Sequence, residues 1–129
     1  MAAGQEILIR PLHEHAELAE AVALQQEIWG FADRDLLPFR FFVVASHIGG
    51  QVLGAFDGPK MVGFLIAIPG LKPGPKPYLH SHMLGVLSSY RNCGLGEKLK
   101  LAQKQDALAR GIHWIEWTFD PLEVKNAYF

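Results

Sequence analysis

The sequence from Gly85 to Leu99, GVLSSYRNCGLGEKL, leads from an apolar strand through a turn with two glycines into a helix. Gly94 and Gly96 remove side chains where the backbone enters the helix. The amides of a first helical turn lack partners inside the helix, and the positive end of the helix dipole lies behind them, an arrangement that binds phosphate groups. The spacing fits neither a Gly-x-Gly-x-x-Gly dinucleotide fingerprint nor a Walker A loop, since Glu97 follows the second glycine. Two glycines alone also fit a tight structural turn.

Strands and helices follow one another on either side of this turn. Pro11 ends a short first strand, Gly30 and Gly111 follow helical patterns, and the turn 57–60, Asp-Gly-Pro-Lys, between two apolar runs is typical of an antiparallel hairpin. The predicted strands cover 6–10, 51–56, 61–68, 78–87 and 112–119, and the predicted helices cover 13–29, 39–48 and 94–110, with a strand as the alternative for 39–48. Four prolines and two glycines in 69–77 predict an irregular loop, and Asp120-Pro121 predicts the start of a further helix.

The composition is that of one folded domain. Small domains centre on about 100–150 residues, so the 129 residues predict a single domain covering 1–129. Hydrophobic residues make up 50% of the chain and charged residues 19%, which excludes a disordered chain. Twelve basic and thirteen acidic residues give a net charge of −1, which argues against nucleic acid as a partner.

The sequence gives no sign of export or membrane insertion. Residues 1–10 have neither the basic nor the apolar region of an export signal, and Cys93 has no second cysteine to pair with. No apolar run approaches the roughly 18 residues that cross a bilayer. We therefore expect a soluble, cytoplasmic protein with no membrane partner.

The low charged fraction predicts that part of the surface is covered. A second copy of the chain, as in a homodimer, or a segment outside this sequence would supply that cover. Since the helix predicted from Pro121 has only nine residues before the sequence ends, and no closing strand follows it, we expect the chain to be incomplete at its C-terminus.

Two histidines stand on the strand that precedes the glycine turn. At the two-residue period of a strand, His80 and His82 project from one face. Imidazole titrates near neutral pH, so such a pair is suited to accepting a proton. A His-x-His pair is also half of a metal site, which His47, His113 or Glu116 would have to complete, and a histidine on a half-buried strand often has only a structural role. We expect no metal.

The pattern Arg91-x-x-Gly94-x-Gly96, with an apolar strand before it and Leu95 and Leu99 after it, resembles motif A of the GNAT superfamily of N-acetyltransferases, Gln/Arg-x-x-Gly-x-Gly/Ala. The order of the predicted elements is also similar to that of the family up to its fourth helix. The resemblance implies a GNAT-like acyl-CoA N-acyltransferase fold of the α/β (α+β) class. Its mixed, mostly antiparallel central sheet has helices on both faces, and its C-terminal strands would be missing here.

The resemblance also implies a cofactor site. The backbone amides of motif A hold the pyrophosphate of acetyl-coenzyme A in the family, and the strand before it pairs with the pantetheine arm. The residues that match these roles are Arg91, Asn92, Cys93, Gly94, Leu95 and Gly96 for the pyrophosphate, Leu84 and Val86 for the arm, and Asn126 for the family's asparagine in the fourth helix. Lys98, Lys100 and Lys104 either meet the 3′-phosphate of the cofactor or form a solvated helix face.

The string from His80 to Val86 is similar to the arylalkylamine N-acetyltransferase branch, and His80 falls where the histone acetyltransferase branch has its glutamate base. The resemblance therefore implies direct transfer of an acetyl group from acetyl-coenzyme A, as cosubstrate, to an amine-bearing acceptor. His80, with His82 behind it, would accept the proton of the amine. The alternative is a non-catalytic acyl-CoA-binding sensor or scaffold, and a third reading is a structural subunit that binds no cofactor.

Overall fold

The computed structural model describes residues 7–30, 36–71, 76–91 and 93–117. In this part of the chain, one sheet runs in the order β1-β2-β3-β4-β5, with antiparallel pairing between the first four strands and parallel pairing of β5 with β4. The strands are β1 (Ile7–Pro11), β2 (Gln51–Asp57), β3 (Lys60–Leu71), β4 (Pro77–Val86) and β5 (Ile115–Trp117). The helices are α1 (His15–Trp29), α2 (Phe39–His47) and α3 (Leu95–Ala109), with a short 3₁₀ turn at Ser88–Tyr90.

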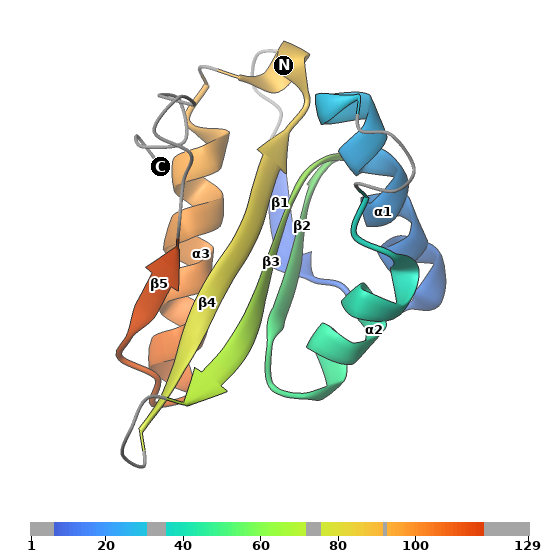
Figure 1. The fold of residues 1–129 in the computed structure, drawn as a ribbon. Helices are drawn as coiled ribbons and strands as arrows, with labels where there is room; N and C mark the ends of the chain where they lie inside the picture. Colours follow the sequence, from blue (N-terminus) through green and yellow to red (C-terminus); the bar gives the residue numbers. More distant parts are fainter. Residues whose placement is uncertain (1–6, 31–35, 72–75, 92, 118–129) are drawn as a thin grey trace.

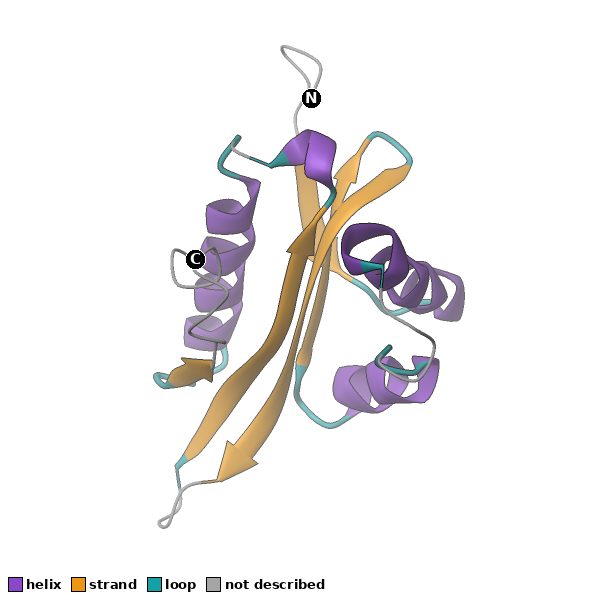
Figure 2. Ribbon diagram, turned by 45° about the horizontal axis from the view of Figure 1, so that its top comes forward, coloured by secondary structure: helices purple, strands orange, loops and turns teal. Residues whose placement is uncertain are grey.

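The helices cover both faces of the sheet. Helices α1 and α2 pack on one face and α3 packs on the other, as Figure 1 and Figure 2 show from two directions. The predicted α/β class, with a mixed and mostly antiparallel sheet between helices, is confirmed. The segment 39–48, for which a strand was the alternative, forms a helix.

Glycines end the helices and shape the hairpin where the sequence predicts. Gly30 follows α1 in the left-handed region, with φ of 67°, and Gly111 follows α3 with φ of 77°. Gly58, with φ of 61°, lies in the turn between β2 and β3. A side chain rarely adopts this backbone conformation, which is why glycine occupies these turns.

The loop predicted for 69–77 is too long. Pro69, Gly70 and Leu71 belong to β3 and Pro77 to β4, with Pro69 opposite Leu79. In the described residues, the pairing of β3 with β2 ends at Ala67, so Pro69 lies where β3 has a neighbour on one side only. A proline there removes no hydrogen bond to a second strand.

The strand predicted for 112–119 is shorter than expected. Residues 112–114 precede β5, since Ile112 donates its amide to the carbonyl of Ala107 and so completes the end of α3. The amide of Leu79 donates to the carbonyl of Trp114, just before the regular pairing of β5 begins. Residues 118 and 119, and the helix predicted from Pro121, lie outside the described residues.

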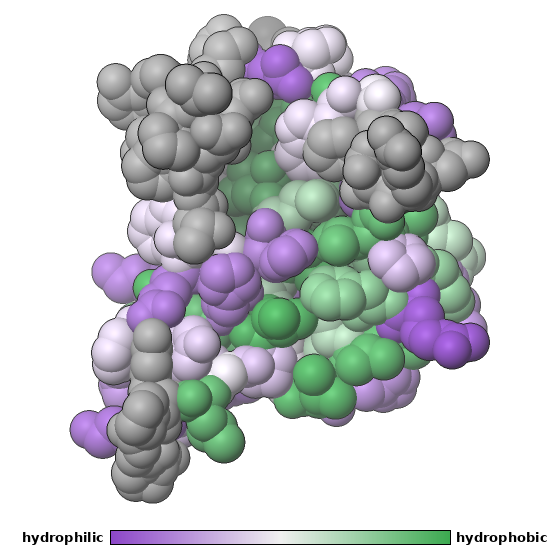
Figure 3. Space-filling model, in the orientation of Figure 1, coloured by the Kyte–Doolittle hydropathy of each residue, from purple (hydrophilic) through white to green (hydrophobic). Residues whose placement is uncertain are grey.

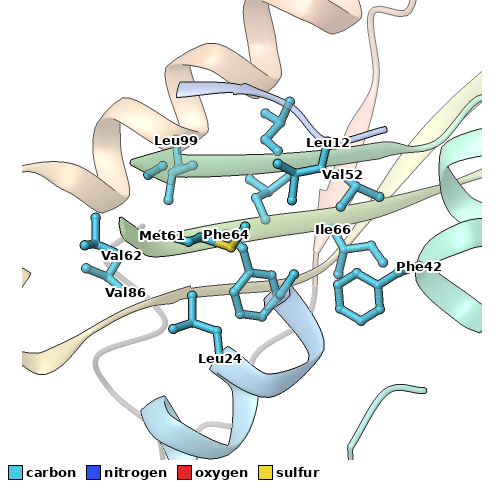
Figure 4. Close-up of a cluster of buried hydrophobic side chains, with 14 of the residues drawn as sticks. Leu12, Leu24, Phe42, Val52, Met61, Val62, Phe64, Ile66, Val86 and Leu99 are labelled. Carbon is cyan, nitrogen blue, oxygen red and sulfur yellow. The ribbon is translucent and has the colours of Figure 1, made fainter. Parts of the chain in front are cut away.

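The core lies on both sides of β3. All residues from Met61 to Ala67 are buried, because helices cover both faces of this strand. The ring centre of Phe64 lies 6.0 Å from those of Phe42 and Trp29, on the face that α1 and α2 cover. Leu99 of α3 lies on the opposite face, and Figure 4 shows part of this cluster.

A buried amide fixes the segment that leads into α2. Gln25 of α1 is fully buried, donates from its Nε2 to the carbonyl of Leu37 and accepts from the amide of Leu37, both at 2.9 Å. These two bonds tie α1 to the chain just before α2. No helix in the described ranges is both long and apolar enough to span a membrane.

Candidate functional site

The first turn of α3 has the geometry that its glycines predict. Gly94 is exposed and left-handed, with φ of 78° and ψ of 9°, and no side chain in the described part of the chain caps the helix. Its carbonyl accepts the first bond of the helix from the amide of Lys98, at 3.1 Å. The amides of the first turn, before Lys98, have no acceptor within the helix. Leu95 and Gly96 are buried, and Asn92 lies outside the described residues.

Side-chain contacts hold the segment before this turn. Tyr90 is buried and its hydroxyl donates to the carboxylate of Asp57, at the end of β2. That hydrogen bond raises the pKa of Tyr90. The guanidinium of the exposed Arg91 contacts the carbonyl of Val86 at 3.4 Å, and the thiol of Cys93 donates to the carbonyl of Tyr90 at 2.7 Å. The segment that leads into this turn is therefore anchored to the end of β2 and to β4.

Strand β4 has a bulge at His82. Ser81 pairs with Ala67 and Met83 with the adjacent Ile66, so His82 has no partner on β3. On its other side, β4 pairs with the described residues of β5 over Leu79–Ser81. In the portion of the chain that is described, no strand adjoins that edge between His82 and Val86, the stretch that includes the predicted residues Leu84 and Val86.

A hollow lies over the upper part of β4. Figure 3 shows it beside α1, with apolar atoms at its floor. The first turn of α3 and the C-terminal end of β4 lie at the same end of the sheet (Figure 1). The structure thus brings Arg91, Gly94 and the upper half of β4 together, as the sequence predicts.

The two histidines lie close together on the face of α1 and α2. Their ring centres are 5.9 Å apart, and the ring of His82 lies 5.5 Å from that of Phe41 on α2. Partial burial, followed by the neighbouring His80, lowers the pKa of His82. A lowered pKa keeps the imidazole neutral at pH 7, the form that accepts a proton.

The metal alternative gains no support from the described residues. His47 ends α2, His113 lies in the connection before β5, and Glu116 is on β5 opposite His80. Within the ranges that the structure describes, no three histidine, cysteine or carboxylate side chains are arranged to hold a metal ion.

The sequence reasoning missed the position of Lys100. Lys98 and Lys104 are exposed, but Lys100 is half-buried and donates to Ser81 Oγ at 3.0 Å. It is therefore not part of a solvated helix face. The helical period contains the signal, because Lys100 follows Leu99 and precedes Gln103 and Ala107, which are all buried. Asn126, the remaining predicted site residue, lies outside the described residues.

Known proteins share this architecture. The aminoglycoside acetyltransferase structure from an uncultured soil metagenomic sample, in complex with trehalose, superposes with a TM-score of 0.84 at 17% identity, over 95% of this chain and 84% of that one. An aminoglycoside N-acetyltransferase in complex with CoA gives 0.75 at 17% identity, over 99% and 86% of the two chains. Ribosomal-protein-alanine N-acetyltransferase from Brucella melitensis biovar Abortus 2308 gives 0.73 at 18% identity, over 95% and 87%.

Sequence comparison identifies the family. Among curated proteins, none matches this chain in sequence. The sequence profile of the acetyltransferase (GNAT) family, however, matches residues 12–127, which is most of the chain and includes both the glycine turn and the two histidines. The chain belongs to the GNAT family of acetyltransferases.

Proposed function

We propose that the chain is an acetyl-CoA-dependent N-acetyltransferase that transfers an acetyl group directly to an amine. One observation carries the proposal: among the described residues, the first turn of α3 has no side-chain cap and follows the left-handed Gly94, and it adjoins a stretch of β4, residues 82–86, that is paired on one side only. The turn offers amides to a diphosphate, and the edge offers amides and carbonyls to an extended chain. A thioester carrier such as acetyl-coenzyme A has both parts. The CoA bound to a structural neighbour supports this choice of carrier.

The pyrophosphate would lie at the loop from Arg91 to Gly96. The guanidinium of Arg91 adds a positive charge to the amides that follow Gly94. The pantetheine arm would pair with the backbone of Leu84 and Val86. The backbone amide near Leu84, next to the bulge, would then donate to the thioester carbonyl and stabilise the negative charge that forms on its oxygen.

The histidine pair would prepare the acceptor amine. An amine attacks only as the neutral base, so a group near the thioester has to take up its proton. His80 and His82 lie on the face opposite α3, and the lowered pKa of His82 leaves it unprotonated at neutral pH. We assign proton acceptance to His80, with His82 passing the proton on. Two of the fold neighbours are an aminoglycoside acetyltransferase and a ribosomal-protein-alanine N-acetyltransferase, and we propose that this chain's acceptor is likewise an amine.

The test separates binding from chemistry. Calorimetry with acetyl-coenzyme A measures binding, and mass spectrometry of an amine panel measures acetylation. The panel holds an aminoglycoside, an arylalkylamine and a peptide with N-terminal alanine. We expect binding and acetylation of at least one amine. His80→Ala and His82→Ala together should lower turnover by about 100-fold, within the range for general bases, and leave cofactor binding unchanged.

His47→Ala is the matched control, because His47 is an exposed histidine at the end of α2. It should leave both measurements unchanged. Full turnover without His80 and His82 would refute the assigned mechanism. Cofactor binding with no acetylated amine would favour the sensor or scaffold, and no binding of acetyl-coenzyme A would favour the structural subunit.

A further inference from the structure

Lys100 places a positive charge between three elements. Its stem leaves α3 on the face toward the sheet, and its Nζ donates to Ser81 Oγ of β4 at 3.0 Å and to Gln103 Oε1 at 3.1 Å. The same nitrogen lies 4.3 Å from the ring centre of Trp117 on β5. The proposed mechanism makes no use of this group.

No negative charge accompanies this ammonium in the described part of the chain. Its partners are a hydroxyl, an amide oxygen and an aromatic ring. By contrast, Arg10 pairs with Glu17, and Arg110 pairs with Asp106 at 3.1 Å. Burial lowers the pKa of Lys100 to about 8, and no carboxylate opposes that effect. A half-buried cation without a counter-charge destabilises the folded chain, and an anionic ligand would offset this.

Donor capacity remains unused beside this charge. An ammonium has three hydrogens, and two of the Lys100 hydrogens have protein acceptors. Gln103 accepts from Lys100 through its Oε1, while its Nε2 and the Oε1 of the adjacent Gln51 are buried without a hydrogen-bond partner in the described residues. Gln103 itself is only 1% exposed. Lys100 therefore has one hydrogen left to donate, which a carboxylate would accept.

The charge lies at the closed end of the proposed groove. Ser81 and Trp117, which both contact the ammonium, face each other in the last pair that the described residues form between β4 and β5. Beyond this pair begins the β4 edge that would receive the pantetheine arm. If the thioester carbonyl is bound at Leu84, three residues from Ser81, it lies roughly 10 Å along the strand from this closed end.

We infer that the closed end of the groove binds a carboxylate at the tip of the acyl group, so that the donors include thioesters of dicarboxylic acids such as succinyl-coenzyme A. The inference rests on the proposed function, since it needs the same groove. An acetyl group ends one bond, about 1.5 Å, beyond its carbonyl carbon. A succinyl group extends about 5 Å, and a hydrogen bond of about 2.8 Å then covers most of the remaining distance to Lys100.

The test compares donors of equal length. Calorimetry of the full chain with succinyl-coenzyme A and with butyryl-coenzyme A isolates the carboxylate, and free coenzyme A measures the shared part. We expect succinyl-coenzyme A to bind about 10- to 100-fold more tightly than butyryl-coenzyme A, the range of one charge-assisted hydrogen bond. Lys100→Met should remove this preference and keep the affinity for coenzyme A. Lys104→Met, an exposed lysine on the same helix, should retain the preference.

The outcomes distinguish failure of this inference from failure of the proposed function. Equal affinity of the wild-type chain for succinyl- and butyryl-coenzyme A, with coenzyme A bound, would overturn the inference and leave the proposed function intact. A preference that persists in Lys100→Met would also overturn it. Failure of the wild-type chain to bind coenzyme A would refute the proposed function and the inference with it. Should Lys100→Met not fold, Lys100→Gln, which keeps a polar end without charge, takes its place with the same expected loss.

Discussion

Two glycines at opposite ends of α3 allow the proposed diphosphate site to be tested against a matched control. Gly94 and Gly111 have nearly equal φ angles, 78° and 77°, and a Cβ atom added to either meets no atom within 4 Å. Alanine therefore introduces no clash at either end. What remains is the strain of a left-handed backbone, about 1–2 kcal/mol for a residue with a side chain.

The two variants should lose similar stability. Gly94→Ala and Gly111→Ala should each lower the free energy of unfolding by about 1–2 kcal/mol, measured by urea denaturation. For a chain of 129 residues, an unfolding entropy of about 2.1 cal/mol/K per residue converts each kcal/mol into a decrease of about 4 °C in Tm.

Coenzyme A binding should separate the variants. If alanine at Gly94 leaves the left-handed region, the peptide that joins it to Leu95 rotates, and the first-turn amides no longer point together. Losing one charge-assisted hydrogen bond to the diphosphate, about 1.5–3 kcal/mol, weakens binding by about 10- to 100-fold. Gly111→Ala should bind coenzyme A like the wild type, because Gly111 lies at the far end of the helix.

Calorimetry with coenzyme A is the deciding measurement. Wild-type affinity in Gly94→Ala would show that these amides do not hold the diphosphate. An equal loss in both variants would show that binding follows the general stability of α3 and not the amides of its first turn. Gly94→Asn is a useful third variant, since asparagine tolerates the left-handed region and should fall between wild type and alanine.

Three further predictions concern packing and charge. Gly85→Ala places a Cβ 2.5 Å from Cη2 of Trp29, so unfolding by urea should show a loss of about 1–3 kcal/mol, and unchanged stability would contradict this packing. Gln25→Ala leaves the amide and carbonyl of Leu37 without their partner, so the free energy of unfolding should fall by about 1–3 kcal/mol. A decrease under 0.5 kcal/mol, roughly that of a surface substitution, would show that these two hydrogen bonds do not stabilise the fold. Burial lowers the pKa of Lys100 from its usual 10.5 to about 8 in the folded chain, so between these pH values the unfolded chain binds more protons and stability rises with pH. The urea midpoint of the wild type should therefore rise relative to Lys100→Met between pH 7.5 and roughly pH 10, and parallel profiles would refute the shift.

Local chemistry made most of the fold predictable. The turn at Gly58, the helix ends at Gly30 and Gly111, and the alternation that brings His80 beside His82 depend on neighbouring residues, and the structure confirms them. Pro69 was expected in a loop but belongs to β3, because a proline is tolerated there only where the pairing of β3 with β2 has ended. That end is a property of the sheet and leaves no mark in the local sequence.

The candidate site was predictable in part for the same reason. Arg91 and Gly94 form a local motif and lie where the sequence places them. The bulge at His82 depends on the register between β3 and β4, which the sequence of β4 alone does not specify. The partners of Lys100 come from β4 and β5 as well as α3, so only the folded chain reveals that this lysine has no counter-charge among the described residues.

The strand order has a consequence for how the chain folds. Strands β2, β3 and β4 form successive hairpins, whose contacts are close in sequence, whereas β5 reaches β4 only after the whole of α3. Contacts that close short loops form faster than those that close long ones. We therefore expect the hairpins to become protected from hydrogen exchange early in refolding, and the pairing of Ser81 with Trp117 to form late. On the ribosome, a nascent chain would accordingly hold its histidine pair in a formed hairpin before β5 pairs with β4.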